Sequence, residues 1–340
     1  MKLSSSTRTS VPEAFTGTFH EEMDSTMDDI YACALLGVLG ANPYLLEKIL
    51  SRSCNPKEAF LRMGGEFLPS RPDLRGERAD ILVRSEFSVL FSPSSFSSPS
   101  HIFLRRDSLS YPHTLRECPD SPFGVFIRSN ARCSRFFSRR NYLLAVSVPS
   151  RLTPYGRECL ESAMESISRL SRECEGRLIV VSGLEDGAEG DIQGMAMRER
   201  IPSVAVTGRP DGSLPSQASR GLCEHLSDSY SHCLLTDIPF FCSPEKDRRR
   251  LMERRDRIIA GLSDGVLVIE ASRGFQTRLA RYSFDYGRSV FALPGRVFDP
   301  MSEGCNILIR DNIAQALSSP DELPMWLNPA LDCRFEGRAI

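Results

Sequence analysis

Three short and almost uninterrupted apolar runs constrain the fold of this chain most strongly. They read LLAVSV at 143–148, LIVVSG at 178–183 and VLVIEA at 266–271. A strand that is apolar on both sides must be buried on both faces, and this is typical of parallel sheets covered by helices on either side. Because amphipathic stretches separate the runs, we predict an α/β, Rossmann-like, doubly wound domain with a mostly parallel sheet.

The alternation of apolar and amphipathic segments continues along much of the chain. It predicts strands at 142–148, 178–182, 203–207, 233–236, 265–270 and 289–292. It predicts helices near 155–174, 188–199, 216–229, 248–262, 275–287 and 304–317. In such a sheet the carboxyl ends of the parallel strands lie along one edge, where ligands usually bind.

Changes in composition divide the chain into segments. Residues 1–26 are polar and aperiodic, which predicts a disordered tail, and 27–70 carry apolar residues at helical spacing, which predicts a small helical domain of SAM or HhH-like type. Residues 71–107 include a serine- and proline-rich stretch and are expected to form a linker. The Rossmann-like domain is expected at 108–320, and 321–340 are expected to be a C-terminal tail without a winged helix.

Composition argues against several classes of protein. The eleven cysteines form no C-x-x-C pair and the five histidines show no H-E-x-x-H spacing, so no metal site is expected. No apolar run reaches the roughly 18 residues of a membrane span, and no signal peptide is recognisable, so we expect a cytoplasmic protein without membrane association. The net charge is −2, yet lysine occurs only at positions 2, 48, 57 and 246. Arginine binds phosphate bidentately, although genomic base composition explains this bias equally well.

Two predicted strand ends carry candidate binding residues. After the first strand, Ser150, Arg151 and Thr153 lead into a helix, which suits either contact with a phosphate or simple capping of the helix. After the second strand, Ser182 and Gly183 open a turn bracketed by glycines. The acidic pair that follows, at 185–186, would repel a pyrophosphate, so a dinucleotide is disfavoured and no cofactor is expected.

A basic helix and two glycine turns complete the set of motifs. Arg250, Arg254 and Arg257 share one face of the helix at 248–262, beside Arg255, and could follow a nucleic-acid backbone. The alternative is a solvated face held by ion pairs along the helix. The turns at 294–295 and 304–306 are ordinary structural turns when each is considered by itself.

Together and in this order, these motifs resemble the DprA (DNA-processing, Smf) family over about residues 111–317. The resemblance is carried by YPHTL at 111–115, RIIAGLS at 257–263, FALPG at 291–295 and GCNILI at 304–309. This chain departs from the family pattern at Pro149, where glycine is usual. It is also acidic at Glu185, Asp186 and Asp256, where the family has alanine, arginine and asparagine.

The resemblance implies a homodimeric protein that binds single-stranded DNA, shields it from nucleases and loads the RecA recombinase in natural transformation, with no catalysis. The residues expected to contact DNA are Ser150, Arg151, Thr153, Ser182, Gly183, Arg250, Arg254, Arg255 and Arg257.

Two alternatives remain open from the sequence. A Rossmann-like nucleotide or nucleoside-phosphate hydrolase could use Glu270, at a strand end, as its acid or base. A degenerate family member could instead serve as a protein-interaction module, because acidic residues stand at the presumed DNA edge.

Overall fold

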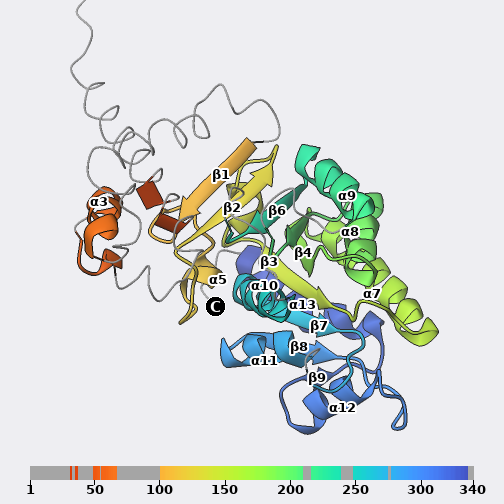
Figure 1. Cartoon of the computed structure of the whole chain (residues 1–340). Helices are drawn as coiled ribbons and strands as arrows, with labels where there is room; N and C mark the ends of the chain where they lie inside the picture. Colours follow the sequence, from red (N-terminus) through yellow and green to blue (C-terminus); the bar gives the residue numbers. More distant parts are fainter. Residues whose placement is uncertain are drawn as a thin grey trace, which may run out of the picture. The chain divides into compact units, whose positions relative to one another are not determined.

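The computed structural model describes residues 31–32, 35–36, 49–53, 55–66, 100–209, 216–238, 248–274 and 277–335. The chain divides into two compact units, Met1–Ser95 and Phe96–Ile340 (Figure 1). In the first unit, helix α3 (Pro56–Glu66) contributes Phe60, whose ring lies 5.9 Å from that of Tyr31. The predicted tail at 1–26 and residues 71–99 of the predicted linker lie outside the described residues, and the SAM or HhH-like type of the helical domain stays a prediction.

The second unit contains a nine-stranded sheet in the order β1-β2-β6-β5-β4-β3-β7-β8-β9. Its strands are β1 (Ser100–Arg105), β2 (Gly124–Ser129), β3 (Tyr142–Ser147), β4 (Leu178–Gly183), β5 (Ser203–Val206), β6 (His232–Thr236), β7 (Gly265–Val268), β8 (Ser289–Ala292) and β9 (Gln315–Ala316). The pairings from β6 through β9 are parallel, whereas β1 with β2 and β2 with β6 are antiparallel. The predicted Rossmann-like fold is therefore confirmed, and each predicted strand is present.

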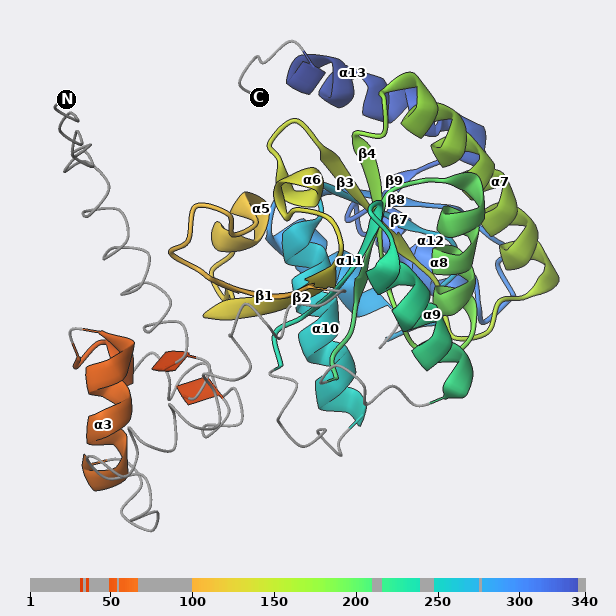
Figure 2. The same ribbon diagram turned by 90° about the horizontal axis from the view of Figure 1, so that it is seen from above.

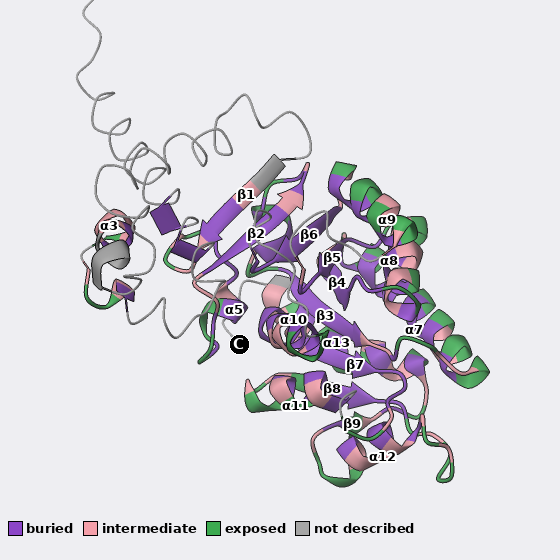
Figure 3. Cartoon of the chain, in the orientation of Figure 1, coloured by how far each residue is buried: buried purple, intermediate pink, exposed green. Residues whose placement is uncertain are grey.

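Helices cover both faces of this sheet (Figure 2). One face carries α7 (Pro154–Glu173), α8 (Ala188–Glu199), α9 (Gln217–Asp228) and α13 (Leu323–Phe335), and the other carries α5 (His113–Arg116), α6 (Ser134–Phe137), α10 (Arg248–Leu262), α11 (Arg278–Asp285) and α12 (Glu303–Arg310). Along β3, Leu143 and Ala145 pack on the α10 side while Leu144 and Val146 pack on the α7 side. This period-two alternation buries each strand on both faces, as Figure 3 shows for the central strands.

Three segments differ from the sequence-based expectation. Strand β1 (Ser100–Arg105) occupies the end of the predicted linker, where it forms an antiparallel sheet edge with β2. The predicted tail at 321–340 contains α13, because Leu323, Leu327 and Leu331 recur every four residues and are buried in the core. The helix predicted at 304–317 already ends at Arg310, since Asn312 adopts a left-handed φ of 53° and the chain then forms β9.

No helix in the described part of the chain is both long and apolar enough to span a bilayer.

A chain of buried polar side chains crosses the α7 side of the sheet. The amide of Gln193 donates to Ser182 Oγ at 2.8 Å, and Ser203 Oγ donates to Gln193 Oε1 at 2.7 Å. Ser203 Oγ also lies 2.9 Å from His232 Nδ1. Because burial lowers the pKa of His232 from 6.5 to about 4, the imidazole is neutral at pH 7.

We predict that His232 makes the protein acid-sensitive between pH 6.5 and about 4. Below pH 6.5 the unfolded chain binds a proton that the folded chain excludes, so the free energy of unfolding falls by at most about 3 kcal/mol as the pH decreases. Urea unfolding of the wild type and of His232→Gln across this range checks the prediction. His225→Gln, at an exposed histidine, is the matched control. An identical acid profile for His232→Gln and the wild type would contradict it.

Candidate nucleic-acid interface

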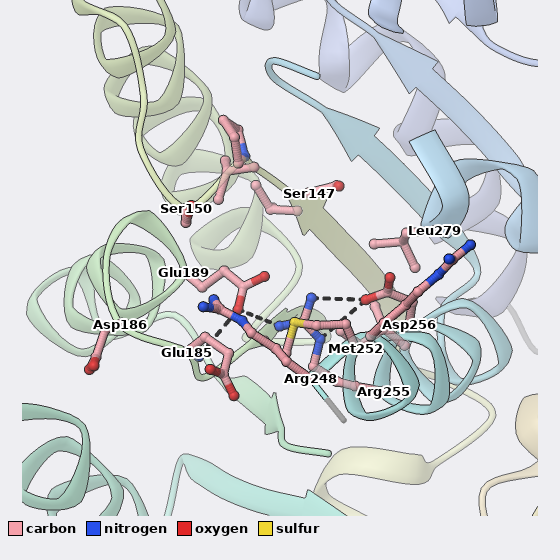
Figure 4. A pocket seen from close by; sticks show the side chains of 16 residues that line it. Ser147, Ser150, Glu185, Asp186, Glu189, Arg248, Met252, Arg255, Asp256 and Leu279 are labelled. Carbon is pink, nitrogen blue, oxygen red and sulfur yellow. Dashed lines mark hydrogen bonds and ion pairs between the residues drawn. The ribbon is translucent and has the colours of Figure 1, made fainter. Parts of the chain in front are cut away.

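A pocket of about 490 Å³ lies at the carboxyl ends of β3 and β4, against one side of α10. Its apolar wall comes from Val146, Val148, Met252, Ile259 and Leu279. Its polar wall comes from Ser147, Ser150, Glu185, Asp186, Glu189, Arg248, Arg249, Arg255 and Asp256 (Figure 4). The pocket is thus at the sheet edge where the topology of a doubly wound sheet predicts a ligand.

The centre of the pocket is a buried ion network around Arg255. Its Nη1 donates to Glu189 Oε2 at 2.7 Å and its Nη2 donates to Asp256 Oδ1 at 2.8 Å (Figure 4). The second oxygen of Asp256 accepts from Arg278 Nη2 at 2.6 Å. A Cβ at Gly183 would lie 2.2 Å from Glu189 Oε2, so glycine is needed there for the carboxylate and guanidinium to approach the strand end.

The pKa values in this network reflect both burial and pairing. Burial lowers the pKa of Arg255, but the carboxylates of Glu189 and Asp256 outweigh it and raise the pKa above its usual value. Burial raises the pKa of Glu189, more than the positive charge of Arg255 lowers it. The charge of Arg255 is therefore permanent, but it is largely engaged with the protein's own carboxylates.

The other arginines expected to contact DNA along α10 are also engaged. Arg254 pairs with the buried Asp237, and Arg257 pairs with Asp120. Arg250 is exposed in the first turn of the helix. The predicted stripe does lie on α10, and Arg254 and Arg257 are ion-paired, but with acids outside the helix and not along it as the alternative supposed.

The turn after β3 presents Ser150 and Arg151 to solvent. The carbonyl of Ser150 accepts from the N–H of Ala188 at 3.2 Å, and a Cβ at Gly187 would lie only 2.2 Å from that carbonyl. Gly187 also has a φ of 103°, a conformation that favours glycine. Arg151 forms no ion pair with any described residue, so its charge is available to a ligand.

Two residues that were expected to contact DNA have structural roles instead. Ser182 is fully buried and its hydroxyl accepts from Gln193, so it lies beneath the pocket surface and the expectation is corrected. Thr153 caps α7, because its Oγ1 accepts from Gly156 N at 3.1 Å while its hydroxyl donates to Glu270. Of the two roles that the sequence allowed for Thr153, phosphate contact or helix capping, the structure shows helix capping.

Glu270 is a structural link between β7 and α7. Its side chain accepts from the hydroxyl of Thr153 and, at 3.0 Å, from the N–H of Thr153, and only 2% of the residue is exposed. A Cβ at Gly156 would lie 2.1 Å from its Oε2, so glycine is needed at this point of α7. With both oxygens occupied and buried, Glu270 is poorly placed to serve as the acid or base of a hydrolase.

Arg248 is a pocket residue that is absent from the contacts predicted from the sequence, although helical spacing could have indicated it. Arg248, Met252, Arg255 and Ile259 follow one another at helical spacings of four and three, and all of them line the pocket. Arg248 is exposed and forms no ion pair with a described residue. Together with Arg151, it supplies exposed positive charge at this edge of the sheet, and the charge of Arg248 also helps to lower the pKa of Asp186.

The acidic residues at the rim have partners too. Glu185 accepts from Arg209 Nε at 3.1 Å, whereas Asp186 accepts from the hydroxyls of Ser216 and Ser219. These hydroxyls lower the pKa of Asp186, which is exposed and therefore fully charged at neutral pH. Asp186 is the acidic residue of the pocket that would repel a phosphate most directly.

Residues 102–328 match the family of DNA recombination-mediator protein A. The chain belongs to this family. It is 27% identical over 214 residues to DNA processing protein DprA of Streptococcus pneumoniae, a match that covers 63% of this chain and 70% of the relative. It is 29% identical over 226 residues to protein Smf of Escherichia coli, with 66% of this chain and 56% of the relative covered.

Solved structures of DprA proteins share the fold. DprA of S. pneumoniae superposes with a TM-score of 0.57 at 24% identity, covering 73% of this chain and 84% of that one. DNA processing protein A of Helicobacter pylori superposes with a TM-score of 0.54 at 16% identity, and the match covers 70% of this chain and 97% of that one. The Rossmann-like sheet with its flanking helices is therefore the common architecture.

We predict that the Arg255 network is needed for stability. Arg255→Met leaves Glu189 buried without its counter-charge, and the loss of one partner of a buried ion pair costs about 3 to 5 kcal/mol. Urea unfolding measures this loss. Arg151→Met, at an exposed arginine, is the matched control and should change stability by no more than about 0.5 kcal/mol.

A double variant tests the cause of the loss. Arg255→Met combined with Glu189→Gln should recover part of the stability, because the uncompensated charge is removed. If Arg255→Met alone were as stable as the wild type, the network would have no structural role.

Proposed function

We propose that this protein binds single-stranded DNA along the sheet edge formed by the carboxyl ends of β3 and β4, shields the strand and delivers it to the RecA recombinase, acting as a homodimer in recombination and natural transformation. Family membership supports the proposal. DNA processing protein A of H. pylori, which shares the fold, has a single-stranded DNA binding mode. No catalytic step is part of the proposed function.

The observation that carries the proposal is the exposed charge at the pocket rim. Arg151 stands on the turn after β3 and Arg248 stands at the start of α10, and neither forms an ion pair with a described residue. Arg248 and Ser150, the neighbour of Arg151, line the pocket together with an apolar wall that includes Val148 and Met252. Single-stranded DNA offers phosphates for the arginines and bases for an apolar surface, and this combination is typical of its binding sites.

The same geometry predicts modest affinity. Arg255, Arg254 and Arg257 are held by carboxylates of the chain, so phosphates would have to displace an existing partner in order to bind them. An arginine that contacts phosphate contributes to the salt dependence of binding, whereas an arginine that remains in an intramolecular pair does not.

We predict that Arg151→Ala weakens binding and flattens its salt dependence. Losing one phosphate contact should reduce the slope of log K against log salt by about 0.7 on single strands. Fluorescence anisotropy of a labelled oligonucleotide across a salt series measures the slope. Arg257→Ala is the matched control, because that arginine is paired with Asp120 and should leave the slope unchanged.

The two variants separate the possible results. Equal slopes for the wild type and Arg151→Ala would remove Arg151 from the interface. No binding by the wild type at low salt would refute the proposed function and favour a protein-interaction module instead.

We also predict that Asp186→Asn increases affinity for single-stranded DNA by about two- to fivefold at low salt, because one exposed negative charge is removed. Asparagine keeps an oxygen that can accept from Ser216 and Ser219, so the fold should be preserved. The same anisotropy assay measures the change, and it should shrink as salt is added. Asp228→Asn, an exposed acid at the far end of α9, is the control. Unchanged affinity in Asp186→Asn would place the DNA away from this rim.

A further inference from the structure

A second cleft lies beside the pocket, between the start of α7 and the loop that follows β8. It encloses about 540 Å³ and is lined by Pro154 and Tyr155 on one side and by Pro294 and Arg296 on the other. The hydroxyl of Tyr155 donates to the carbonyl of Pro294 at 2.8 Å and joins the two walls. Of the residues expected from the sequence to contact DNA, Thr153 lines this cleft, whereas Tyr155, Pro294 and Arg296 are additional residues.

The loop after β8 exposes apolar side chains that the fold does not use. Phe298 is 99% exposed and Val297 is 81% exposed, and Tyr155 on the opposite wall is 44% exposed. A fully exposed phenylalanine loses the free energy that burial of its ring would provide, so it marks a contact surface when charge and geometry agree.

The charge around this cleft is suited to a polyanion. Arg296 lines the cleft and is exposed, and the exposed Arg151 precedes the lining residue Thr153 by two positions; neither arginine forms an ion pair with a described residue. The carboxylate in the cleft is Asp299, which already accepts from the N–H of Met301 at 2.9 Å. Exposed aromatic rings and unpaired arginines on one edge of the sheet match the bases and phosphates of a single strand.

The cleft lies on the same edge of the sheet as the proposed DNA site. Strands β3, β7 and β8 are parallel neighbours, so the segments that follow them lie on the same edge of the sheet. Thr153, after β3, is bonded to Glu270, after β7, and Tyr155 is bonded to Pro294, after β8. A strand that passes Ser150 and Arg151 therefore arrives at this cleft next.

We propose that the cleft extends the single-stranded DNA track, with Phe298 and Tyr155 stacking on bases while Arg151 and Arg296 contact the flanking phosphates. This inference rests on the proposed function. A second protein is a poorer fit, because a stable protein interface buries about 800 Å² per partner and the exposed apolar surface of this loop is confined to Val297 and Phe298.

The test compares two labelled oligonucleotides of equal length, one with bases and one with abasic residues on the same phosphate backbone. Phe298→Ala in the full chain should weaken binding of the base-bearing strand by about 5- to 150-fold, the usual range for loss of one stacking ring. Its salt slope should stay unchanged, because no charge is removed. Wild type and variant should bind the abasic strand equally, and Phe298→Trp should restore affinity for the base-bearing strand.

Leu109→Ala is the matched control, since Leu109 is 98% exposed and lies in the segment between β1 and α5. If Phe298→Ala binds the base-bearing strand like the wild type while Arg151→Ala is impaired, the stacking inference is overturned and the proposed function stands. If the wild type binds neither strand, the proposed function itself fails. If Phe298→Ala instead changes the oligomeric state in sedimentation without changing DNA affinity, the loop is a protein interface and the inference is also overturned.

Discussion

The ion network around Arg255 is the interaction on which the candidate site depends. Arg255 belongs to α10, Glu189 to α8 and Arg278 to α11, and the carboxylate of Asp256 joins the two arginines. These helices lie on opposite faces of the sheet, so the network connects the two layers across the strand ends. Removing one member would leave a buried charge without a partner, which is far more costly than losing an exposed pair. The network therefore joins the walls of the pocket that α8, α10 and α11 contribute.

The network also sets the electrostatic character of the pocket. A buried arginine held by two carboxylates contributes little net positive potential to the surface above it. The field that a phosphate experiences therefore comes from the exposed arginines, Arg151 and Arg248, and is opposed by Asp186. A protein with a net charge of −2 can present an anion-binding edge in this way, because local placement of a few charges matters more than the total. For this reason, the sequence of α10 suggests more arginines available to a phosphate than the structure leaves free of carboxylate partners.

Sequence patterns predicted the centre of the fold well and its margins poorly. The runs at β3, β4 and β7 are apolar throughout because both faces are covered, and this pattern needs no knowledge of partners. The sequence predicts a linker at β1 because SHIFLR follows a serine- and proline-rich stretch, and its pairing with β2 at the sheet edge depends on a tertiary contact. For the site, helical spacing placed arginines on α10, but the pairing of Arg257 with Asp120 and of Arg254 with Asp237 depends on tertiary contacts that spacing does not encode.

Hydrogen bonds along the sheet edge hold the exposed arginines in position, which would help a few of them to bind a flexible DNA strand. Three hydrogen bonds connect the segments that follow neighbouring strands. The segment after β3 is bonded to Ala188 after β4, to Glu270 after β7 and to Pro294 after β8. Binding requires that flexible groups be ordered, and a side chain on a fixed turn loses less entropy than one on a mobile loop. Gly156 and Gly187 permit the approaches of Glu270 and Ser150, and Gly183 permits that of Glu189, because a Cβ at each position would obstruct them. The glycines and hydrogen bonds of this edge are therefore as important to the proposed DNA track as the arginines that they position.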